Sequence, residues 1–351
     1  MATNLSRRSV IAAGGIGLIG FPALARPILQ AGHERDWAWL IGNWDVHHRR
    51  LRDRLVGSTT WDEFAGKSAL WLTMGGLGTI DDNSLALPAG DYRAISIRAF
   101  DPATRQWAIW WLDGRNSGKI EPPVLGGFTG DEGSFTGADI HKGQPVTARF
   151  RWHEIHGKRP NWDQALSTDG GKSWEINWRN WFTRTSPSPA PLPMLPDAPH
   201  DFDFLVGSWN VRHRKLKTRL AGSNDWDEFT GTLVNWPVMG GHGNIGDNLM
   251  DAPAGSFRGM GIRTWDADAR LWRSWWLDGR NPAAIGPAVE GGFADGIGVF
   301  EGADSLNGRP IRTRVRWLQI TPNSARWEQS ASADNGATWE VNWISDFQRR
   351  A

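Results

Sequence analysis

Apolar and polar residues alternate along most of this chain in short runs with a period of two. The runs are rich in Trp, Val, Ile and Phe, and turn signals such as "DPATR", "DGRN" and "NGRP" interrupt them roughly every ten residues. Such alternation is typical of strands with one buried face. No sustained segment with the helical period follows the first 25 residues. The pattern predicts an all-β protein made of antiparallel barrels or sandwiches.

The chain consists of one unit repeated. "WLIGNWDVHHRRLRDRLVGSTTWDEFAG" begins at Trp39 and "FLVGSWNVRHRKLKTRLAGSNDWDEFTG" at Phe204, and the offset of about 165 residues continues without a gap to the end of each copy. "WWLDGRN" occurs at 110–116 and again at 275–281. A unit of about 150 residues has the size of a domain and is too long for a solenoid repeat. We expect domains at 36–184 and 201–351, joined by an extended proline-rich linker at 185–200.

The first residues have the pattern of an export signal. Arg7-Arg8 precedes a short apolar run from Val10 to Phe21, and Ala23-Leu24-Ala25 fits the small-x-small cleavage pattern. The run is too short and too rich in glycine to span a bilayer comfortably. The arginine pair resembles a twin-arginine signal. We expect residues 1–25 to engage the twin-arginine export machinery and deliver the protein to the periplasm or outside the cell, without a stable membrane anchor.

A Gly-x-Trp motif opens the first expected strand of each copy, at Gly42-x-Trp44 and Gly207-x-Trp209. It resembles the motif of lipocalins and other calycins. The resemblance implies two tandem antiparallel calycin-like β-barrels, in which each Trp closes one end beneath an arginine of the last strand. Arg184 and Arg349 are the candidates, since an arginine stacks well on an indole. "FLVGSWNV" is also similar to an uncharacterised lipocalin-like family of bacteria, which implies no activity. "DWAWL" and "DFDFL" are expected to form a short helix or 3₁₀ turn at each entrance.

Two other repeated strings indicate hairpin turns. Asp-Gly in "WWLDGRN" suits a tight turn. The residues after it are not required by a turn, so they either order the loop or form a rim that binds a ligand: Arg115, Asn116, Arg280 and Asn281. "STDGGKSW" and "SADNGATW" resemble the Asp-box of sialidase propellers, in which the carboxylate accepts turn N–H bonds. Two copies are too few for a propeller, so we assign a structural role to Asp169, Trp174, Asp334 and Trp339.

Of nine histidines, only His48 and His213 stand at equivalent positions. Each follows the Gly-x-Trp tryptophan by four residues, so both side chains share a face and point into the barrel if the Trp does. Four roles stay open: a hydrogen-bonded core histidine, a ligand donor, an acid or base, and a haem ligand. One histidine per unit is too few for a structural zinc site, and we expect no metal.

Further polar residues recur at matched strand positions and are candidates for ligand contacts: Glu63, Glu228, Arg98 and Arg263. Arg149 and Arg151 share a face opposite Phe150 and Trp152. Either the arginines line the lumen, where they would bind an anionic headgroup, or the aromatic rings do.

Composition narrows the function. The absence of cysteine excludes disulfides and thiolate chemistry, and the net charge of +1 gives no electrostatic case for nucleic acid. The 24 tryptophans, beside one tyrosine, suit cups lined by indole rings with a few fixed polar groups. We therefore expect each barrel to bind a small amphipathic or apolar ligand.

Two alternatives remain at this stage. Lipocalin-like twin-barrel proteins include hydratases acting on isoprenoids. That resemblance implies a lyase or hydratase with His48 or His213 paired to Glu63 or Glu228 as acid and base. A haem barrel resembling nitrobindin, with His48 or His213 as iron ligand, is the other. The sequence otherwise assigns no cofactor.

Overall fold

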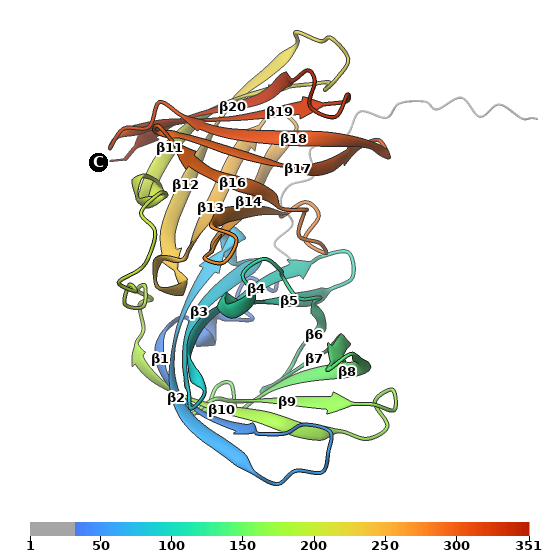
Figure 1. Ribbon diagram of the computed structural model, residues 1–351. Helices are drawn as coiled ribbons and strands as arrows, with labels where there is room; N and C mark the ends of the chain where they lie inside the picture. Colours follow the sequence, from blue (N-terminus) through green and yellow to red (C-terminus); the bar gives the residue numbers. More distant parts are fainter. Residues whose placement is uncertain (1–31, 351) are drawn as a thin grey trace, which may run out of the picture.

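The computed structural model describes residues 32–350 and consists almost entirely of β-strands (Figure 1). Its 20 strands form two closed antiparallel barrels, in which every strand pairs with the next and the first pairs with the last. The expected all-β class and tandem barrels are confirmed. The export signal expected at residues 1–25 lies outside the described residues.

The first barrel contains β1 (Gly42–Leu51), β2 (Trp61–Thr73), β3 (Gly78–Leu87), β4 (Gly90–Asp101), β5 (Gln106–Asp113), β6 (Val124–Thr129), β7 (Glu132–His141), β8 (Gln144–His153), β9 (Asn161–Ser167) and β10 (Glu175–Ser186). The second contains β11 (Gly207–Leu216), β12 (Trp226–Val238), β13 (Gly243–Ala252), β14 (Gly255–Asp266), β15 (Leu271–Asp278), β16 (Val289–Ala294), β17 (Ile297–Leu306), β18 (Arg309–Leu318), β19 (Ser324–Ser332) and β20 (Glu340–Arg349). Five 3₁₀ turns accompany them: η1 (Ala38–Leu40), η2 (Met74–Gly76), η3 (Gly114–Asn116), η4 (Asp203–Leu205) and η5 (Met239–Gly241).

One end of each barrel is filled by aromatic side chains and crossed by a 3₁₀ turn. In the first barrel η1 brings Trp37 into a core that also holds Trp44, Trp107 and Trp152. In the second, η4 follows Phe202, which packs beside Trp209 and Trp317. The expected short turn at each entrance is confirmed. We call this the lid end. The opposite end, which holds the loop that connects β1 to β2 and the loop that connects β11 to β12, is called the distal end.

The Gly-x-Trp motif organises the lid end. Trp44 is 3% exposed, its Nε1 donates to Leu40 O at 2.8 Å, and the Arg184 guanidinium lies 4.0 Å from its ring. Arg349 lies 4.2 Å from the ring of Trp209 in the same way. Gly42 has a φ of 118°, and a Cβ there would lie 2.1 Å from the carbonyl oxygen of Ser186. Only glycine fits where β1 meets β10 so closely.

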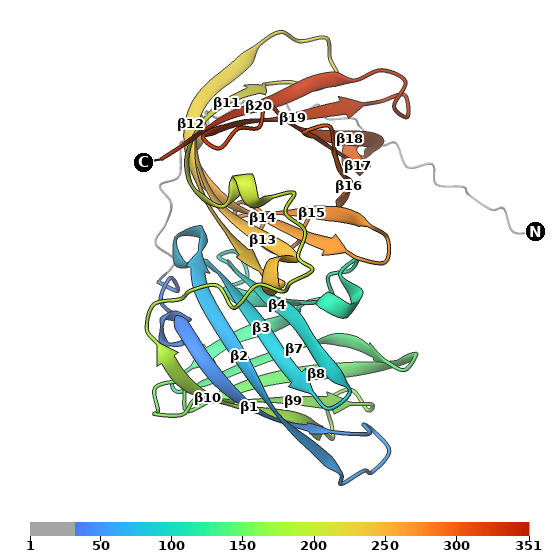
Figure 2. The same cartoon turned by 60° about the vertical axis from the view of Figure 1, so that its left-hand side comes forward.

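The two barrels pack against each other through the outer faces of β3–β5 and β13–β15 (Figures 1 and 2). One continuous core is formed by residues of both barrels: Met74, Ile80, Ile95, Ile97, Ala99, Ala108, Trp110, Leu112, Val238, Met239, Ile245, Met260, Ile262, Trp275 and Leu277. Trp110 and Trp275, the first tryptophans of the two "WWLDGRN" strings, are therefore buried between the barrels. Alternation turns their neighbours, Trp111 and Trp276, towards the inside of their own barrels.

Two matched hydrogen bonds cross this contact. Met239 N donates to Asp82 Oδ1 at 2.9 Å, and Met74 N donates to Asp247 Oδ1 at 3.0 Å. Equivalent residues of the two copies thus meet reciprocally, as in an isologous dimer. Burial raises the pKa of Asp82 to about 7, although the Met239 N–H and the charge of Arg93 oppose the rise.

The proline-rich segment between the barrels follows their surfaces rather than hanging free (Figure 2). Asn43 exchanges two hydrogen bonds with the backbone of Ala190, and Leu195 N donates to Gly240 O at 2.8 Å. Leu192 and Ala198 are buried. The segment therefore ties the first barrel to the second.

We expect Asp82→Asn to stabilise the protein at alkaline pH. The carboxyl has a higher pKa folded (about 7) than unfolded (3.8), so its favourable contribution is complete below pH 4 and is lost as the pH rises through 7. Asn keeps an acceptor for Met239 N–H without the charge. At about 1.4 kcal/mol per pKa unit, the gain at pH 8 is up to about 4 kcal/mol.

Urea denaturation at pH 5 and pH 8 measures this difference. Asp53→Asn, at an exposed position, is the control and should change neither value. Equal losses of stability between pH 5 and pH 8 in wild type and Asp82→Asn would contradict the assignment.

Candidate functional site

His48 faces the inside of the first barrel near its distal end. Its side chain is buried and stacks on Phe64 at 4.7 Å between ring centroids. Nδ1 lies 2.6 Å from Asn180 Oδ1 and 3.3 Å from Trp178 Nε1. Burial lowers the pKa of His48 to about 4, which the Asn180 contact partly opposes. The imidazole is therefore neutral at physiological pH.

A glycine on the neighbouring strand makes room for this ring. A Cβ at Gly66 would lie 2.4 Å from Nε2 of His48. The second barrel repeats the arrangement, since a Cβ at Gly231 would lie 2.8 Å from Nε2 of His213. Nδ1 of His213 lies 2.8 Å from Ser345 Oγ, and burial lowers the pKa of His213 to about 4.

Neither histidine fits a haem ligand. In His48, Nδ1 is in contact with Asn180 and Trp178, and Nε2 lies against the backbone of β2 at Gly66. Neither ring nitrogen is directed at open space where an iron would sit. Within residues 32–350, no group of three or more His, Asp or Glu side chains could hold a metal ion.

The acid–base pairs of the enzyme hypothesis do not form. In the ladder between β1 and β2, Glu63 is opposite Arg49, so it lies on the outer face while His48 points inward. Glu63 contacts His47 Nε2 at 3.6 Å and Arg49 Nε at 3.5 Å. Glu228 likewise contacts Arg214 outside the second barrel, 3.2 Å from its Nε. The pairing was wrong because Glu63 and Glu228 occupy outward positions of strands whose inward positions hold Phe64 and Phe229.

Unpaired cations lie beside the histidine at the distal end. Arg50 continues the inward face of β1, and its guanidinium lies 5.0 Å from the ring of Trp178. Arg54, from the loop after β1, lies 6.0 Å from the same ring. Burial lowers the pKa of both, for Arg54 to about 10. Neither forms a hydrogen bond or ion pair within the described part of the chain, so both are available to an anion.

An arginine from the "WWLDGRN" turn completes this end. Arg115 lies 3.7 Å from the ring of Tyr92 and is bound to Asp113 through its Nε and Nη2. Desolvation raises the pKa of Tyr92 to about 12, against the pull of the Arg115 charge. Asn116 is exposed on η3 and makes no side-chain hydrogen bond among the described residues. Arg115 therefore joins the site, whereas Asn116 lies outside it.

The second barrel repeats these features with conservative changes. Lys215 lies 4.3 Å from the ring of Trp343, and Arg280 lies 3.7 Å from Phe257. Burial lowers the pKa of Lys215. Asn281, like Asn116, is exposed on its turn. We define the distal cluster as the inward cations and rings of each barrel: His48, Arg50, Arg54, Tyr92, Trp111, Arg115 and Trp178 in the first, and His213, Lys215, Arg219, Phe257, Trp276, Arg280 and Trp343 in the second.

Sequence reasoning missed Arg50, Arg54 and Trp178. A signal was present, because the alternation that turns His48 inward continues to Arg50, and both cations recur in the other copy as Lys215 and Arg219. The meeting of β1 with β10, which brings Trp178 to them, follows only from barrel closure.

Arg98 and Arg263, which the sequence offered as candidates for ligand contacts, differ in their partners between the copies. Arg98 is 2% exposed and its Nη2 donates to Asp81 Oδ2 at 3.0 Å. Arg263 has no carboxylate partner within residues 32–350; its Nη1 donates to Asn244 Oδ1 at 2.9 Å. Both lie near the lid end, where Arg98 is 4.4 Å from the ring of Trp37. They belong to the interior but not to the distal cluster.

The Asp-box-like turns bind their own backbone. Asp169 accepts bonds from the N–H groups of Lys172 and Ser173 and from the Ser173 hydroxyl. These bonds, the hydroxyl of Ser173 first, hold its pKa well below the usual range. Trp174 lies beneath Arg149 at 4.2 Å. In the second barrel, Asp334 and Trp339 make the matching contacts.

The orientation of β8 is settled by its core contacts. Phe150 and Trp152 pack inside the first barrel, so Arg149 and Arg151 lie outside. Arg151 Nη2 donates to Asp163 Oδ2 at 3.2 Å on that outer face. An anionic headgroup held by these two arginines inside the barrel is therefore excluded.

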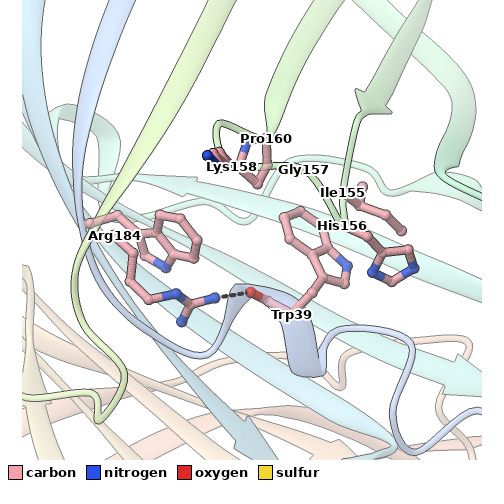
Figure 3. Close-up of a pocket in the computed structure, with 8 residues that line it drawn as sticks. Trp39, Ile155, His156, Gly157, Lys158, Pro160 and Arg184 are labelled. Carbon is pink, nitrogen blue, oxygen red and sulfur yellow. Dashed lines mark hydrogen bonds between the residues drawn. The ribbon is translucent and has the colours of Figure 1, made fainter.

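Two surface hollows occur on the first barrel. One, of about 300 Å³, lies at the lid end between η1 and the loop after β8; Arg184 donates there to Trp39 O (Figure 3). The other, of about 440 Å³, lies on the outer face of β8–β10 around Arg151, Asp163 and Trp181. Neither includes a member of the distal cluster.

Comparison with known proteins yields only distant likeness. No family model matches the chain, and no curated protein matches it. An S-type phycobiliprotein lyase from Guillardia theta is similar in structure with 13% identity and a TM-score of 0.31, over 43% of this chain and 90% of that one. A protein of unknown function from the DUF3598 family, from Nostoc punctiforme PCC 73102, aligns over 91% of this chain and 99% of its own with 11% identity and a TM-score of 0.28. Likeness at this level carries no conclusion about activity.

We expect His48 and His213 to stay neutral down to about pH 5. Their pKa values are about 4 folded against 6.5 unfolded, so each stabilises the fold above pH 6.5 and that contribution is lost as the pH falls towards 4. NMR titration of the imidazole C–H signals, assigned with His48→Asn and His213→Asn, measures this. Titration of either ring near pH 6.5 would show that the burial is wrong.

Proposed function

We propose that each barrel binds a small amphipathic molecule that carries an anionic group. The observation that carries this proposal is the distal cluster, in which inward cations without carboxylate partners lie over aromatic rings in both copies. We infer that both barrels are calycin-like and arose by duplication, on the basis of the Gly-x-Trp motif, the stacked arginine and the repeat.

The charge of the ligand is inferred from desolvation. Burial lowers the pKa of Arg50, Arg54 and Lys215, because each loses more hydration than the carboxylates near it restore, and none of the three forms an ion pair within the described residues. A carboxylate, sulfate or phosphate group would restore the lost interactions through charge-assisted hydrogen bonds. A neutral ligand would leave the cations unpaired.

The apolar part of the ligand is inferred from the rings. Phe64, Leu85 and Tyr92 form a buried cluster at this end, and Trp111 and Trp178 pack against it while staying partly exposed. Partly exposed indoles beside a fixed charge are typical of sites for small amphipathic molecules. His48, neutral and held by Asn180, adds a polar group of fixed orientation.

Export is the second part of the proposal. We infer from Arg7-Arg8 and the short apolar run after it that the protein is carried to the periplasm or beyond by the twin-arginine machinery. A lipocalin-like carrier would there meet ligands from outside the cytoplasm. In residues 32–350, no helix has the length and apolar character needed to cross a bilayer.

We expect wild-type protein to bind octanoate at least about tenfold more tightly than octanol, because charge-assisted hydrogen bonds contribute about 1.5–3 kcal/mol each. Arg50→Gln combined with Lys215→Gln should bring octanoate to the affinity of octanol. Isothermal titration calorimetry measures both ligands.

The matched control is Arg52→Gln combined with Lys217→Gln. These cations lie two residues further along each chain segment, are exposed, and are already bound to Asp62 and Asp225. Equal binding of octanoate and octanol to the wild type, or equal losses in the two double variants, would refute an anion-selective distal site.

Replacing Arg7-Arg8 with Lys-Lys should hold the protein in the cytoplasm, since the machinery reads the arginine pair. Cell fractionation of a bacterium with this pathway measures the distribution. The control exchanges Arg49-Arg50 for Lys-Lys and should be exported normally. Periplasmic accumulation of both variants would dismiss twin-arginine export while leaving ligand binding open.

A further inference from the structure

The interiors of the two barrels differ in one charge. In the first barrel the buried Arg98 is neutralised by Asp81, whose Oδ2 accepts from Nη2 at 3.0 Å and whose Oδ1 accepts from Ser96 N at 2.9 Å. Thr79 Oγ1 accepts a third bond, from Nη1 at 3.2 Å. Both partners of this ion pair are inside the barrel and almost fully buried.

In the second barrel the arginine is kept and the carboxylate is gone. Position 246, which is equivalent to Asp81, is glycine, and Asn244 replaces Thr79. Arg263 Nη1 donates to Asn244 Oδ1, and this is the arginine's only hydrogen bond within residues 32–350. Its Nε and Nη2 have no acceptor there. The guanidinium lies 5.2 Å from the ring of Phe202 and 5.7 Å from that of Trp317, inside the lid-end core.

Further donors surround the same point. Asn235 Nδ2 donates to Asn244 Oδ1 at 3.0 Å. The first barrel has a leucine, Leu70, at the position equivalent to Asn235. Asn244 Nδ2 is buried and has no partner among the described residues. Arg263 keeps some accessible surface, whereas Arg98 keeps almost none. Three donor groups of Arg263 and Asn244 are thus left without acceptors beside Gly246.

Desolvation of Arg263 favours an anionic partner. Burial alone lowers the pKa of Arg263 to about 10, so the group is still charged at neutral pH. A buried charge without a partner is strongly unfavourable. The stacking on Phe202 and Trp317 offsets only a small part of that penalty.

We propose that the second barrel binds a carboxylate-sized anion between Arg263, Asn244 and Gly246, in the position that the Asp81 carboxylate occupies in the first barrel. The anion is either a free small carboxylate or the headgroup of a longer molecule. This site lies near the lid end and uses no member of the distal cluster, so it stands without the proposed function.

The experiment exchanges the residues of the two copies. Gly246→Asp combined with Leu233→Ser gives the second barrel the equivalents of Asp81 and Ser68. The Leu233 change is needed because a Cβ at Gly246 would lie 2.9 Å from Cδ1 of Leu233. Calorimetry in a chloride-free buffer should find one formate fewer per chain in this variant than in the wild type, because any formate bound by the distal clusters is common to both proteins. The variant should also melt at a higher temperature than the wild type without formate.

The reciprocal change opens the first barrel. Asp81→Gly should raise the stoichiometry by one formate per chain relative to the wild type, because Arg98 then lacks its carboxylate. Arg263→Gln, which keeps the side chain polar but uncharged, should weaken formate binding about tenfold or more. It keeps the test decisive if the exchanged variant does not fold.

Octanoate separates the two sources of the anion. The binding of each ligand to this site is the difference between the wild type and the Gly246→Asp, Leu233→Ser variant. Octanoate that binds no more tightly than formate indicates a free anion. Octanoate that binds more tightly than formate indicates a headgroup. Identical formate binding in wild type, the exchanged variant and Arg263→Gln would overturn the proposal. The Arg50→Gln, Lys215→Gln protein should lose its preference for octanoate over octanol and still bind formate at the Arg263 site. A failure of the distal site can therefore be distinguished from a failure of the Arg263 site.

Discussion

Burial of both faces of β3–β5 and β13–β15 ties the two barrels into one unit. The inner face of each strand belongs to its own barrel, and the outer face belongs to a core shared with the other. Because adjacent side chains of a strand point to opposite sides, two neighbouring tryptophans serve different cores. Trp110 lies between the barrels and Trp111 belongs to the distal cluster, which accounts for the repeated pair. Asp82 and Asp247 are buried for the same reason, since each must satisfy a backbone N–H at the contact.

The closed wall of each barrel separates the arginines that face solvent from those that face the interior. Outward arginines such as Arg49, Arg151 and Arg214 have acidic neighbours and solvent. Among the inward cations of the described residues, Arg98 is paired with Asp81, and Arg115 and Arg280 are paired with an aspartate of their own turn, whereas Arg50, Arg54 and Lys215 have no ion pair. The barrel wall therefore sorts arginines into surface ion pairs and interior groups that depend on aromatic faces and on anions.

The interiors of the two barrels differ, although the frame of the two copies is the same. The stacked arginine at the lid end, the histidine beside its glycine and the aspartate-bound turns are alike in both copies. The ion pair of Arg98 with Asp81 is not, and neither is the partner of the histidine, Asn180 in one barrel and Ser345 in the other. A residue facing the lumen can change without disturbing the contact between the barrels, because that contact uses the opposite face of each strand.

The sequence by itself determined the repeat, the strands, the turns and the placing of Trp44 and His48 on one face of their strand. These follow from local alternation and from glycine and aspartate at turns, which depend on neighbours in the chain. Only the tertiary structure decided that Trp110 is buried by the other barrel and that Arg50 meets Trp178. Those outcomes depend on the register by which β1 pairs with β10 and on the packing of one barrel on the other. Both join residues more than a hundred positions apart, and no local pattern encodes them.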